Sequence, residues 1–129
     1  MSIEENKAVI QCWIEARNSN DVEAAVAQWS DDPQDCPSVP GQGVRASFNR
    51  FTEGFSGIQI EVHDMVAEGD KVAIWWTFHG THVEAFAGVP ATGRAVSWGG
   101  ADLYTVVKGR IVSVRREGAN LRDILLGSG

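Results

Sequence analysis

The stretch that decides the fold runs from Gly69 to Val112 and reads GDKVAIWWTFHGTHVEAFAGVPATGRAVSWGGADLYTVVKGRIV. Apolar runs rich in β-branched and aromatic residues alternate there with short turn segments, a pattern typical of antiparallel strands. Turns are predicted at Glu68–Lys71 and at Lys108-Gly109, because these residue types favour tight hairpin connections. Strands are therefore expected over 72–79, 94–107 and 110–117.

A further strand is predicted from Ile58 onward, where apolar and polar residues alternate. The alternation then slips, because Met65, Val66 and Ala67 are consecutive apolar residues. We interpret this slip as a β-bulge that bends the strand, so a curved sheet is expected. The strand over 72–79 is apolar on both faces, which predicts helices on one side and a partner subunit on the other.

Helices are predicted before the strands. Ile3–Asn18 has apolar residues at helical spacing and Ser2 as its N-cap, and Asp21 can cap a second apolar helix that reaches Trp29. The third helix, Val44–Phe55, carries an aromatic stripe. A loop is expected over 30–43, which is rich in Pro and Gly, and a last short helix over 121–126. The fold class predicted is α+β, a curved antiparallel or mixed sheet whose three N-terminal helices enclose one pocket.

Length and charge narrow the classes of function. A chain of 129 residues fits one domain, residues 1–129. Its formal net charge of -6 disfavours nucleic acid as a partner, and no apolar run approaches the roughly 20 residues that span a bilayer. The acidic start, MSIEENKAV, does not resemble an export signal, so a cytoplasmic location is expected. Cys12 and Cys36 are expected to be free thiols.

Asp102 is the leading candidate for chemistry. Strand alternation places Trp98, Gly100, Asp102 and Tyr104 on one face, so the carboxylate would lie among aromatic and small residues. A nearby Arg116 would keep Asp102 ionised as a general base and would itself stabilise a developing oxyanion, whereas burial alone would favour the neutral acid. The alternatives are a structural ion pair across two strands, or an Arg116 that points to solvent.

The histidines are weaker candidates. His63 lies near the predicted bulge and either lines the pocket as an acid–base group or points away from it. The spacing of His79 and His82 suits a metal on a helix and not on a strand, so no metal site is predicted, and His82 is expected to make a turn hydrogen bond. Six aromatic residues are either core or lining of a pocket for a flat ligand. They are Trp76, Trp98, Tyr104, Phe48, Phe51 and Phe55.

Three segments resemble one known family. EVHDMVAEGDKVAIWWTFHGTH (61–82), GVPATGR (88–94) and GADLYTVVKGRIV (100–112) are similar to signature stretches of the SnoaL-like polyketide cyclases, within the nuclear transport factor 2-like superfamily. The resemblance implies a cone-shaped barrel with one deep pocket, a homodimer through the outer sheet face, and no metal or organic cofactor. It also implies a polyketide-like substrate and a role in secondary metabolism such as antibiotic biosynthesis.

The resemblance also assigns positions. Cyclases of this family use an Asp near the end of the last strand as general acid/base in an aldol closure, helped by a polar residue on the preceding strand. Counted from Lys108-Gly109, the polar position is Asp102, the principal Asp position is Arg116, and a further carboxylate position falls near Ala119. Related epoxide hydrolases and isomerases pair Asp with Arg across the pocket, as Asp102 and Arg116 would.

Two classes of function follow. The first is a cofactor-free enzyme that cyclises, isomerises, dehydrates or opens an epoxide in a polyketide-like substrate by acid–base catalysis, which places it among lyases, isomerases or epoxide hydrolases. The second is a non-catalytic domain that binds a small apolar ligand or a protein. An enzyme needs Asp102 to face an open cavity, and a structural role predicts a closed pair. A wide pocket mouth is expected beside residues 36–43, since the loop over 31–43 is shorter than usual for the family.

Overall fold

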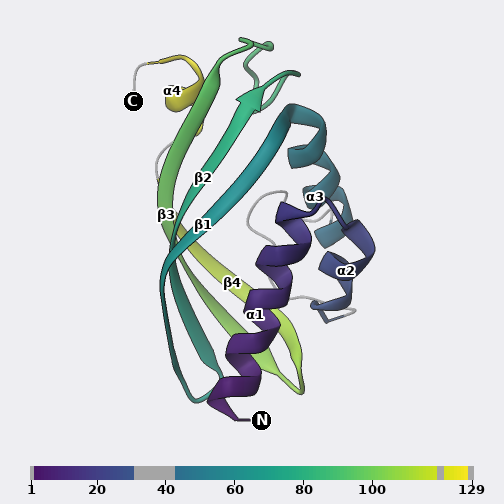
Figure 1. The fold of residues 1–129 in the computed structure, drawn as a ribbon, viewed down its shortest axis with the longest axis vertical. Coiled ribbons are helices and arrows are strands. Elements are labelled where there is room, and N and C mark those ends of the chain that lie inside the picture. The colour runs from purple at the N-terminus through teal and green to yellow at the C-terminus, as the bar shows by residue number, and fades with distance from the viewer. Residues whose placement is uncertain (1, 31–42, 119–120, 128–129) are drawn as a thin grey trace.

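The computed structural model describes residues 2–30, 43–118 and 121–127, and within them three helices precede a four-stranded sheet and a short closing helix (Figure 1). The order of the strands is β1-β2-β3-β4, and every neighbouring pair is antiparallel. The predicted α+β class is confirmed. The elements are α1 (Ile3–Asn18), α2 (Val22–Ala27), α3 (Gly43–Gly54), β1 (Phe55–Glu68), β2 (Lys71–His82), β3 (Ala95–Val107), β4 (Arg110–Gly118) and α4 (Leu121–Leu125).

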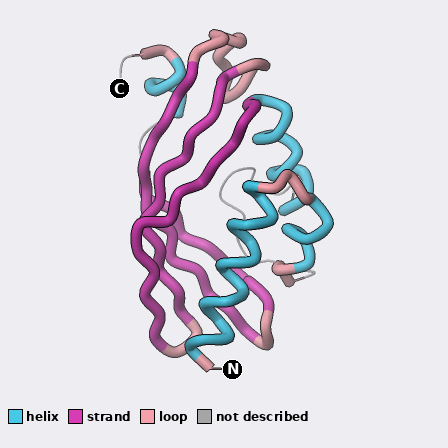
Figure 2. Tube along the Cα trace, in the orientation of Figure 1, coloured by secondary structure: helices cyan, strands magenta, loops and turns pink. Residues whose placement is uncertain are grey.

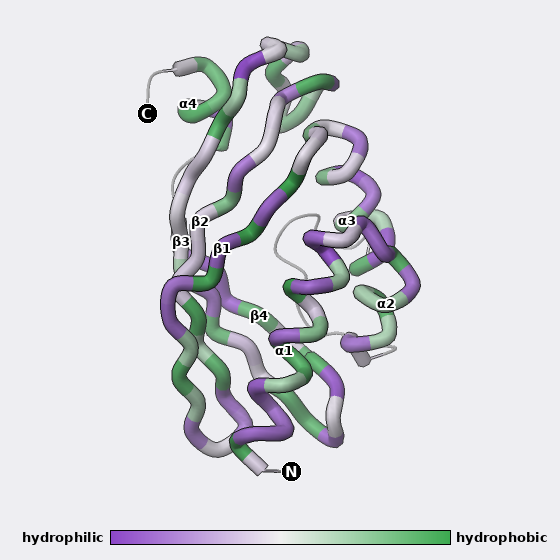
Figure 3. The backbone as a smooth tube through the Cα atoms, viewed as in Figure 1, coloured by the Kyte–Doolittle hydropathy of each residue, from purple (hydrophilic) through white to green (hydrophobic). Residues whose placement is uncertain are grey.

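The three N-terminal helices cover one face of the curved sheet, as Figure 2 shows, and α4 lies near the opposite end of the molecule from the N-terminus. Hydrophobic and hydrophilic residues alternate along the strands in Figure 3. The alternation is clearest in β2, where Val72, Ile74, Trp76 and Phe78 are buried and Trp75 is 58% exposed. The core therefore lies between the helices and the inner face of the sheet. No helix in the described part of the chain is long and apolar enough to cross a membrane.

The two predicted helix caps are present. The Ser2 hydroxyl accepts a hydrogen bond from the Glu5 backbone N–H, and the Glu5 side chain accepts one from the Ser2 N–H, a complete capping box. Asp21 accepts a hydrogen bond from the Ala24 N–H at the start of α2. The second helix ends at Ala27, before the predicted Trp29, because the chain there forms a parallel bridge to Ile111 on β4.

The third helix begins and ends one residue earlier than predicted, because Phe55 already belongs to β1 and pairs with His82. Gly54, the last residue of α3, packs closely against the ring of Phe86. A Cβ atom at Gly54 would lie 2.8 Å from Cδ2 of Phe86, closer than packed side chains approach. α3 and β1 follow each other directly, with no intervening loop.

The predicted bulge at Met65–Ala67 is wrong, because these residues pair regularly with Val72–Ile74. The β1–β2 register instead shifts at two earlier points, between Ser56 and Gln59 and between Val62 and Asp64. Each shift adds one residue to β1 and bends the strand, and it changes which residues of β1 point to the inner face of the sheet. Val66 consequently points outward and is 55% exposed, although the apolar run had suggested a break there.

The predicted hairpin turns are confirmed. Glu68 pairs with Lys71 and Val107 pairs with Arg110. Lys108 and Gly109 both have positive φ, 51° and 77°, as a tight hairpin of matching twist requires. The predictions for the loop over residues 31–42, including Cys36, and for Ala119 lie outside the described residues. Cys12 is a free, exposed thiol, as expected.

Two asparagines attach α1 to β1. Asn18 accepts a hydrogen bond of 2.7 Å from the Ile60 backbone N–H and donates one of 3.0 Å to the Ile60 carbonyl. Near the other end of the helix, Asn6 donates to the carbonyl of Gly69 at 3.2 Å. These contacts fix the position of the helix along the strand and hold its inner face, with Trp13, against the sheet.

Gly100 lies where β3 passes closest to the ring of Trp76. A Cβ atom there would lie 2.6 Å from Cζ2 of Trp76 and 2.7 Å from the backbone oxygen of Glu117. The neighbouring Gly99 has much more room, because its Cβ would meet only the Trp76 carbonyl at 3.4 Å. The predicted close approach at Gly99-Gly100 is thus confirmed at Gly100.

We predict that Gly100→Ala lowers the free energy of unfolding by about 2 kcal/mol or more, since the methyl group must displace an indole ring and a strand backbone. The matched control is Gly99→Ala, which should stay within about 1 kcal/mol of the wild type. Urea denaturation of the three proteins measures both values. Equal stability of the two variants would contradict the close approach at Gly100.

Candidate functional site

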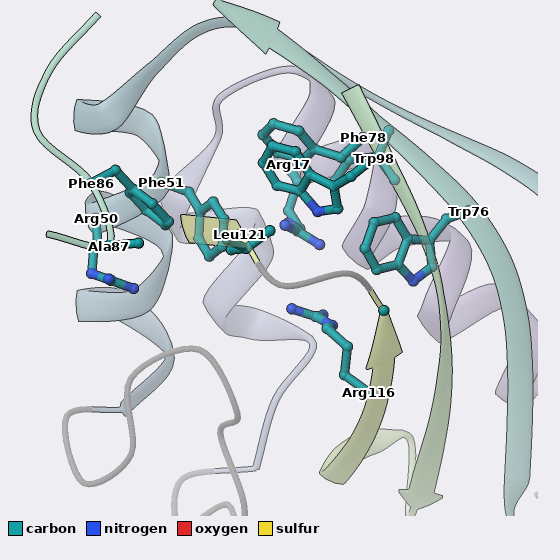
Figure 4. A pocket seen from close by; sticks show the side chains of 12 residues that line it. Arg17, Arg50, Phe51, Trp76, Phe78, Phe86, Ala87, Trp98, Arg116 and Leu121 are labelled. Carbon is teal, nitrogen blue, oxygen red and sulfur yellow. The ribbon is translucent and has the colours of Figure 1, made fainter. Parts of the chain in front are cut away.

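A cavity of about 380 Å³ lies beside the sheet, with helices on its other side (Figure 4). Its wall is mostly aromatic and includes three arginines. The residues that line it are Arg17, Arg50, Phe51, Ile60, Trp76, Phe78, Phe86, Ala87, Trp98, Arg116, Gly118 and Leu121. A smaller cavity of about 30 Å³ shares Arg17, Phe51 and Arg116 with the first. The site is therefore an apolar chamber with positively charged groups in its wall.

Asp102 and Arg116 form a two-pronged ion pair at the wall of the cavity. They are directly opposed in the β3–β4 ladder, which sets the two side chains side by side. Nε of Arg116 donates to Oδ1 of Asp102 at 2.8 Å, and the second guanidinium nitrogen donates to Oδ2 at 3.1 Å. The pair joins two strands and directs the guanidinium of Arg116 along the cavity wall.

Tyr104 extends this pair into the core. Its hydroxyl donates to Oδ2 of Asp102 at 2.7 Å and accepts a hydrogen bond of 3.1 Å from the Trp13 indole N–H. Burial and the negative charge of Asp102 raise the pKa of Tyr104, so the phenol remains a donor. The chain of contacts from Trp13 through Tyr104 to Asp102 thus links α1 to the ion pair.

The two members of the pair differ in exposure. The Asp102 side chain is 1% exposed and lies outside the set of described residues that line the cavity, whereas the Arg116 side chain is 21% exposed and lines it. Burial alone would lower the pKa of Arg116, but the charge and hydrogen bonds of Asp102 outweigh burial and raise it. Arg116 is accordingly a permanent cation that meets the cavity, and Asp102 lies behind it.

Arg17 is a second cation at the cavity. It lies on α1 one turn beyond Trp13, and its guanidinium lies 5.1 Å from the Trp13 ring centre and 5.9 Å from that of Phe51. In Figure 4 the guanidinium groups of Arg17 and Arg116 extend toward the same space. Burial, together with the positive charge of Arg116, lowers the pKa of Arg17 to about 10.

The aromatic wall is built from rings in direct contact. Phe78 and Trp98 stack with ring centres 4.3 Å apart and planes 18° from parallel. Phe51 and Phe86 lie 4.9 Å apart, and the guanidinium of Arg50 lies 4.3 Å from the centre of Phe86. Flat apolar surfaces of this kind are suited to a planar ligand.

The structure brings together only part of the predicted site. Of the six predicted aromatic lining residues, Trp76, Trp98 and Phe51 line the main cavity. Phe48 lines the smaller one. Phe55 and Tyr104 are buried at 2% and 0% exposure, and neither lines either of these two cavities. Four of the six predicted residues thus line one of these two cavities.

His63 lies apart from this cavity. Its imidazole is exposed and hydrogen-bonds to the Thr77 hydroxyl at 2.7 Å. The register shift between Val62 and Asp64 occurs at this residue, and it separates His63 from the inner face that carries Asp102. The structure does not bring His63 together with the Asp102–Arg116 pair.

The other histidines have structural contacts. His82 is fully buried, and its Nδ1 accepts a hydrogen bond from the Thr92 backbone N–H, which confirms the expected turn hydrogen bond. His79 is exposed and lies 3.5 Å from Glu61. Across the described ranges, no group of three or more His, Cys, Asp or Glu residues is placed to hold a metal ion.

Sequence reasoning missed Arg17, although a signal was present. Ile10, Trp13, Ile14 and Arg17 follow one another at helical spacing, so a basic residue ends the apolar stripe of the first helix. A charged residue on a buried helix face indicates either a partner or a cavity. Phe78 and Phe86 were also absent from the predicted lining.

Comparison with known protein families gives one match, which covers most of the chain. The family model of the SnoaL-like polyketide cyclases matches residues 7–121. A search of curated proteins found no match.

Several solved structures are similar to this chain over nearly its whole length. The chain is similar to AclR from Streptomyces galilaeus, a candidate hydroxylase, with 29% identity, a TM-score of 0.85 and 99% of this chain and 98% of that one covered. It is similar to IdmH from Streptomyces antibioticus, a candidate polyketide cyclase, with 26% identity, a TM-score of 0.76 and coverage of 95% and 96%. TsrD from Streptomyces laurentii, 24% identical with a TM-score of 0.88 over 100% and 99%, shares the fold. Because the family model covers most of the chain, this protein belongs to the SnoaL-like polyketide cyclase family.

Proposed function

We propose that this protein is an enzyme of secondary metabolism that converts a polyketide-like substrate in the aromatic cavity, with Arg116 and Asp102 as its polar centre. One observation carries the proposal: Arg116, held by the buried carboxylate of Asp102, is partly exposed and lines a cavity walled by aromatic rings. A fixed cation in a largely apolar chamber stabilises negative charge far better than the same group in water. Membership of a family of polyketide cyclases supports the substrate class.

Arg116 would stabilise an enolate or alkoxide oxygen of the substrate. Cyclisation, isomerisation, dehydration and epoxide opening all develop negative charge on an oxygen, so one guanidinium can serve each of them. Asp102 keeps Arg116 in position through the two hydrogen bonds of the pair. This scheme uses only side chains of the chain itself.

Asp102 is proposed as the acid–base group of the same step. Because Asp102 lies behind Arg116, this step requires the guanidinium to turn from Asp102 to the substrate oxygen, which uncovers Oδ1 so that it can accept a proton from carbon or from a hydroxyl. Oδ2 keeps its hydrogen bond from the Tyr104 hydroxyl, which holds the carboxylate in place during the transfer. The proton taken up on Oδ1 returns to the product, and the ion pair closes again.

A second candidate is a ligand-binding domain without chemistry, and the closed Asp102–Arg116 pair favours it. Both carboxylate oxygens accept hydrogen bonds from Arg116, and the carboxylate is almost completely buried. In this case the pair would be structural, and the cavity would bind a flat apolar molecule unchanged.

We predict that Asp102→Asn and Arg116→Gln each lower kcat on an aromatic polyketide about 100-fold or more. The first substitution removes the group that transfers the proton, and the second removes the cation that stabilises the negative oxygen. Steady-state turnover followed by chromatography of the product measures the effect. Binding of the same polyketide, measured by calorimetry, separates the two candidates, since a ligand-binding domain would bind without turnover.

The exposed pair of Arg45 and Glu23 provides the control. It is also two-pronged, with distances of 2.6 and 3.1 Å, but lies on the surface. Arg45→Gln and Glu23→Gln should therefore turn over substrate like the wild type. If the folded Asp102 and Arg116 variants did the same, the assignment of these residues to catalysis would be wrong.

The outer face of the sheet supports a proposal of homodimerisation. Val66, Ala73 and Leu103 are neighbours across three strands, and Trp75 lies in the next row. Trp75 is 58% exposed and Leu103 38%, so an apolar patch faces outward on the side that the helices leave uncovered. Patches of this kind mark interfaces, and the resemblance to the family indicates a second copy of this chain as the occupant.

We predict that light scattering gives the wild type twice the 14.0 kDa mass of the chain and gives Trp75→Glu the mass of one chain. A buried, unpaired carboxylate at the interface costs more than a small apolar patch returns. Gln11→Glu is the comparison, because it introduces the same charge at an exposed residue of α1, away from the outer face of the sheet, and it should remain dimeric. A wild type of single-chain mass would refute the interface.

A further inference from the structure

Arg17 has aromatic contacts but no carboxylate. The ion pairs and hydrogen bonds of the described residues give its guanidinium no acidic partner, although it is only partly exposed and lines both cavities. Partial removal of a charge from water without a partner costs free energy. The position is thus suited to an anion that arrives with the ligand.

The charges near Arg17 define which anion fits. Arg17 and Arg116 contribute two positive charges, and Asp102, bound to Arg116, contributes one negative charge. The third arginine of the wall, Arg50, lies over the ring of Phe86, away from these groups in Figure 4, so the end of the cavity at Arg17 has a net charge of +1. A monoanion neutralises it, whereas a dianion would leave an excess of negative charge beside buried Asp102. A carboxylate also matches the planar fork of a guanidinium.

The remaining wall defines the body of the ligand. Trp76, Trp98 and Phe51 belong to the wall that surrounds the space into which Arg17 and Arg116 extend (Figure 4). Stacked rings such as Phe78 and Trp98 offer flat contact surfaces that favour fused aromatic rings. We propose that the cavity selects aromatic ligands that bear a single carboxylate, and that the guanidinium of Arg17 binds this group.

The electrostatics of Arg17 agree with the geometry. Burial and the charge of Arg116 lower its pKa to about 10, which means that the surroundings of Arg17 disfavour its positive charge. A bound carboxylate would counter both effects. Arg17 would then hold the substrate while Arg116 stabilises the charge that develops during the reaction.

This inference rests on the proposed function, because it names the substrate class of the same cavity. Its test is a binding measurement with compounds that the protein does not convert. A loss of the Arg17 contact and a loss of turnover are therefore distinguishable: the first changes affinity for an inert acid, and the second changes kcat on a polyketide.

The experiment compares 2-naphthoate with 2-naphthamide, which have the same rings and differ in charge, by isothermal titration calorimetry at millimolar concentration. We expect the wild type to bind the acid about tenfold or more tightly than the amide, a difference of about 1.4 kcal/mol. Arg17→Gln should lose this preference while it binds the amide like the wild type. Arg17→Lys keeps the charge without the fork and should retain part of the preference.

Arg45→Gln is the matched control, since it removes one positive charge from an exposed site on α3 and leaves the cavity intact. It should bind both compounds like the wild type, which excludes an effect of net charge alone. Thermal unfolding confirms that each variant is folded. Equal affinity of the wild type for acid and amide, no saturable binding of the acid, or an unchanged preference in folded Arg17→Gln would each overturn the proposal.

A third probe, 1-naphthyl phosphate, tests the charge of the ligand. The phosphate is mostly a dianion above about pH 7. We expect it to bind less tightly than 2-naphthoate, because the site has one positive charge to neutralise. Tighter binding of the phosphate than of the carboxylate would overturn the assignment to a monoanion.

Discussion

Asp102 and Arg116 face each other across two strands, in a place where neither charge would be stable alone. The carboxylate is buried almost completely, and it remains compatible with the core because Arg116 and Tyr104 supply its hydrogen bonds. Through Tyr104 and Trp13 the same contacts reach the first helix. The sheet register, the position of α1 and the direction of Arg116 are therefore coupled by one group of hydrogen bonds.

Space in the cavity depends on this group and on the absence of a side chain at Gly100. The ring of Trp76 lies over Gly100, and the guanidinium of Arg116 lies 5.7 Å from the centre of that ring. A larger residue at Gly100 would move the indole and so alter the wall beside Arg116. Gly100 and the Asp102–Arg116 pair thus both adjoin the ring of Trp76, and together they determine the shape and the charge of this part of the cavity wall.

The sequence was sufficient for the order of the elements, the hairpin turns and the face of β3 that carries Asp102, because each depends on local pattern. It failed at the bulges of β1, since a register shift depends on how two strands pair and leaves no local mark at His63. The same shift decided the position of His63. That Asp102 lies behind Arg116 instead of in the cavity is a property of side-chain packing, which periodicity does not contain. For Arg17, the sequence shows only a charged residue on the apolar face of a helix and does not predict that it lines a cavity.

Asn18 has an effect beyond the attachment of α1. β1 is an edge strand, and the Asn18 amide occupies both the N–H and the carbonyl of Ile60 in the way that a residue of an adjacent strand would. At the other edge, Gln28 and Ser30 do the same for Ile111 on β4. Exposed strand edges recruit further strands and lead to aggregation. The helical half of the chain therefore interrupts both edges of the sheet and discourages the growth of β-assemblies from them.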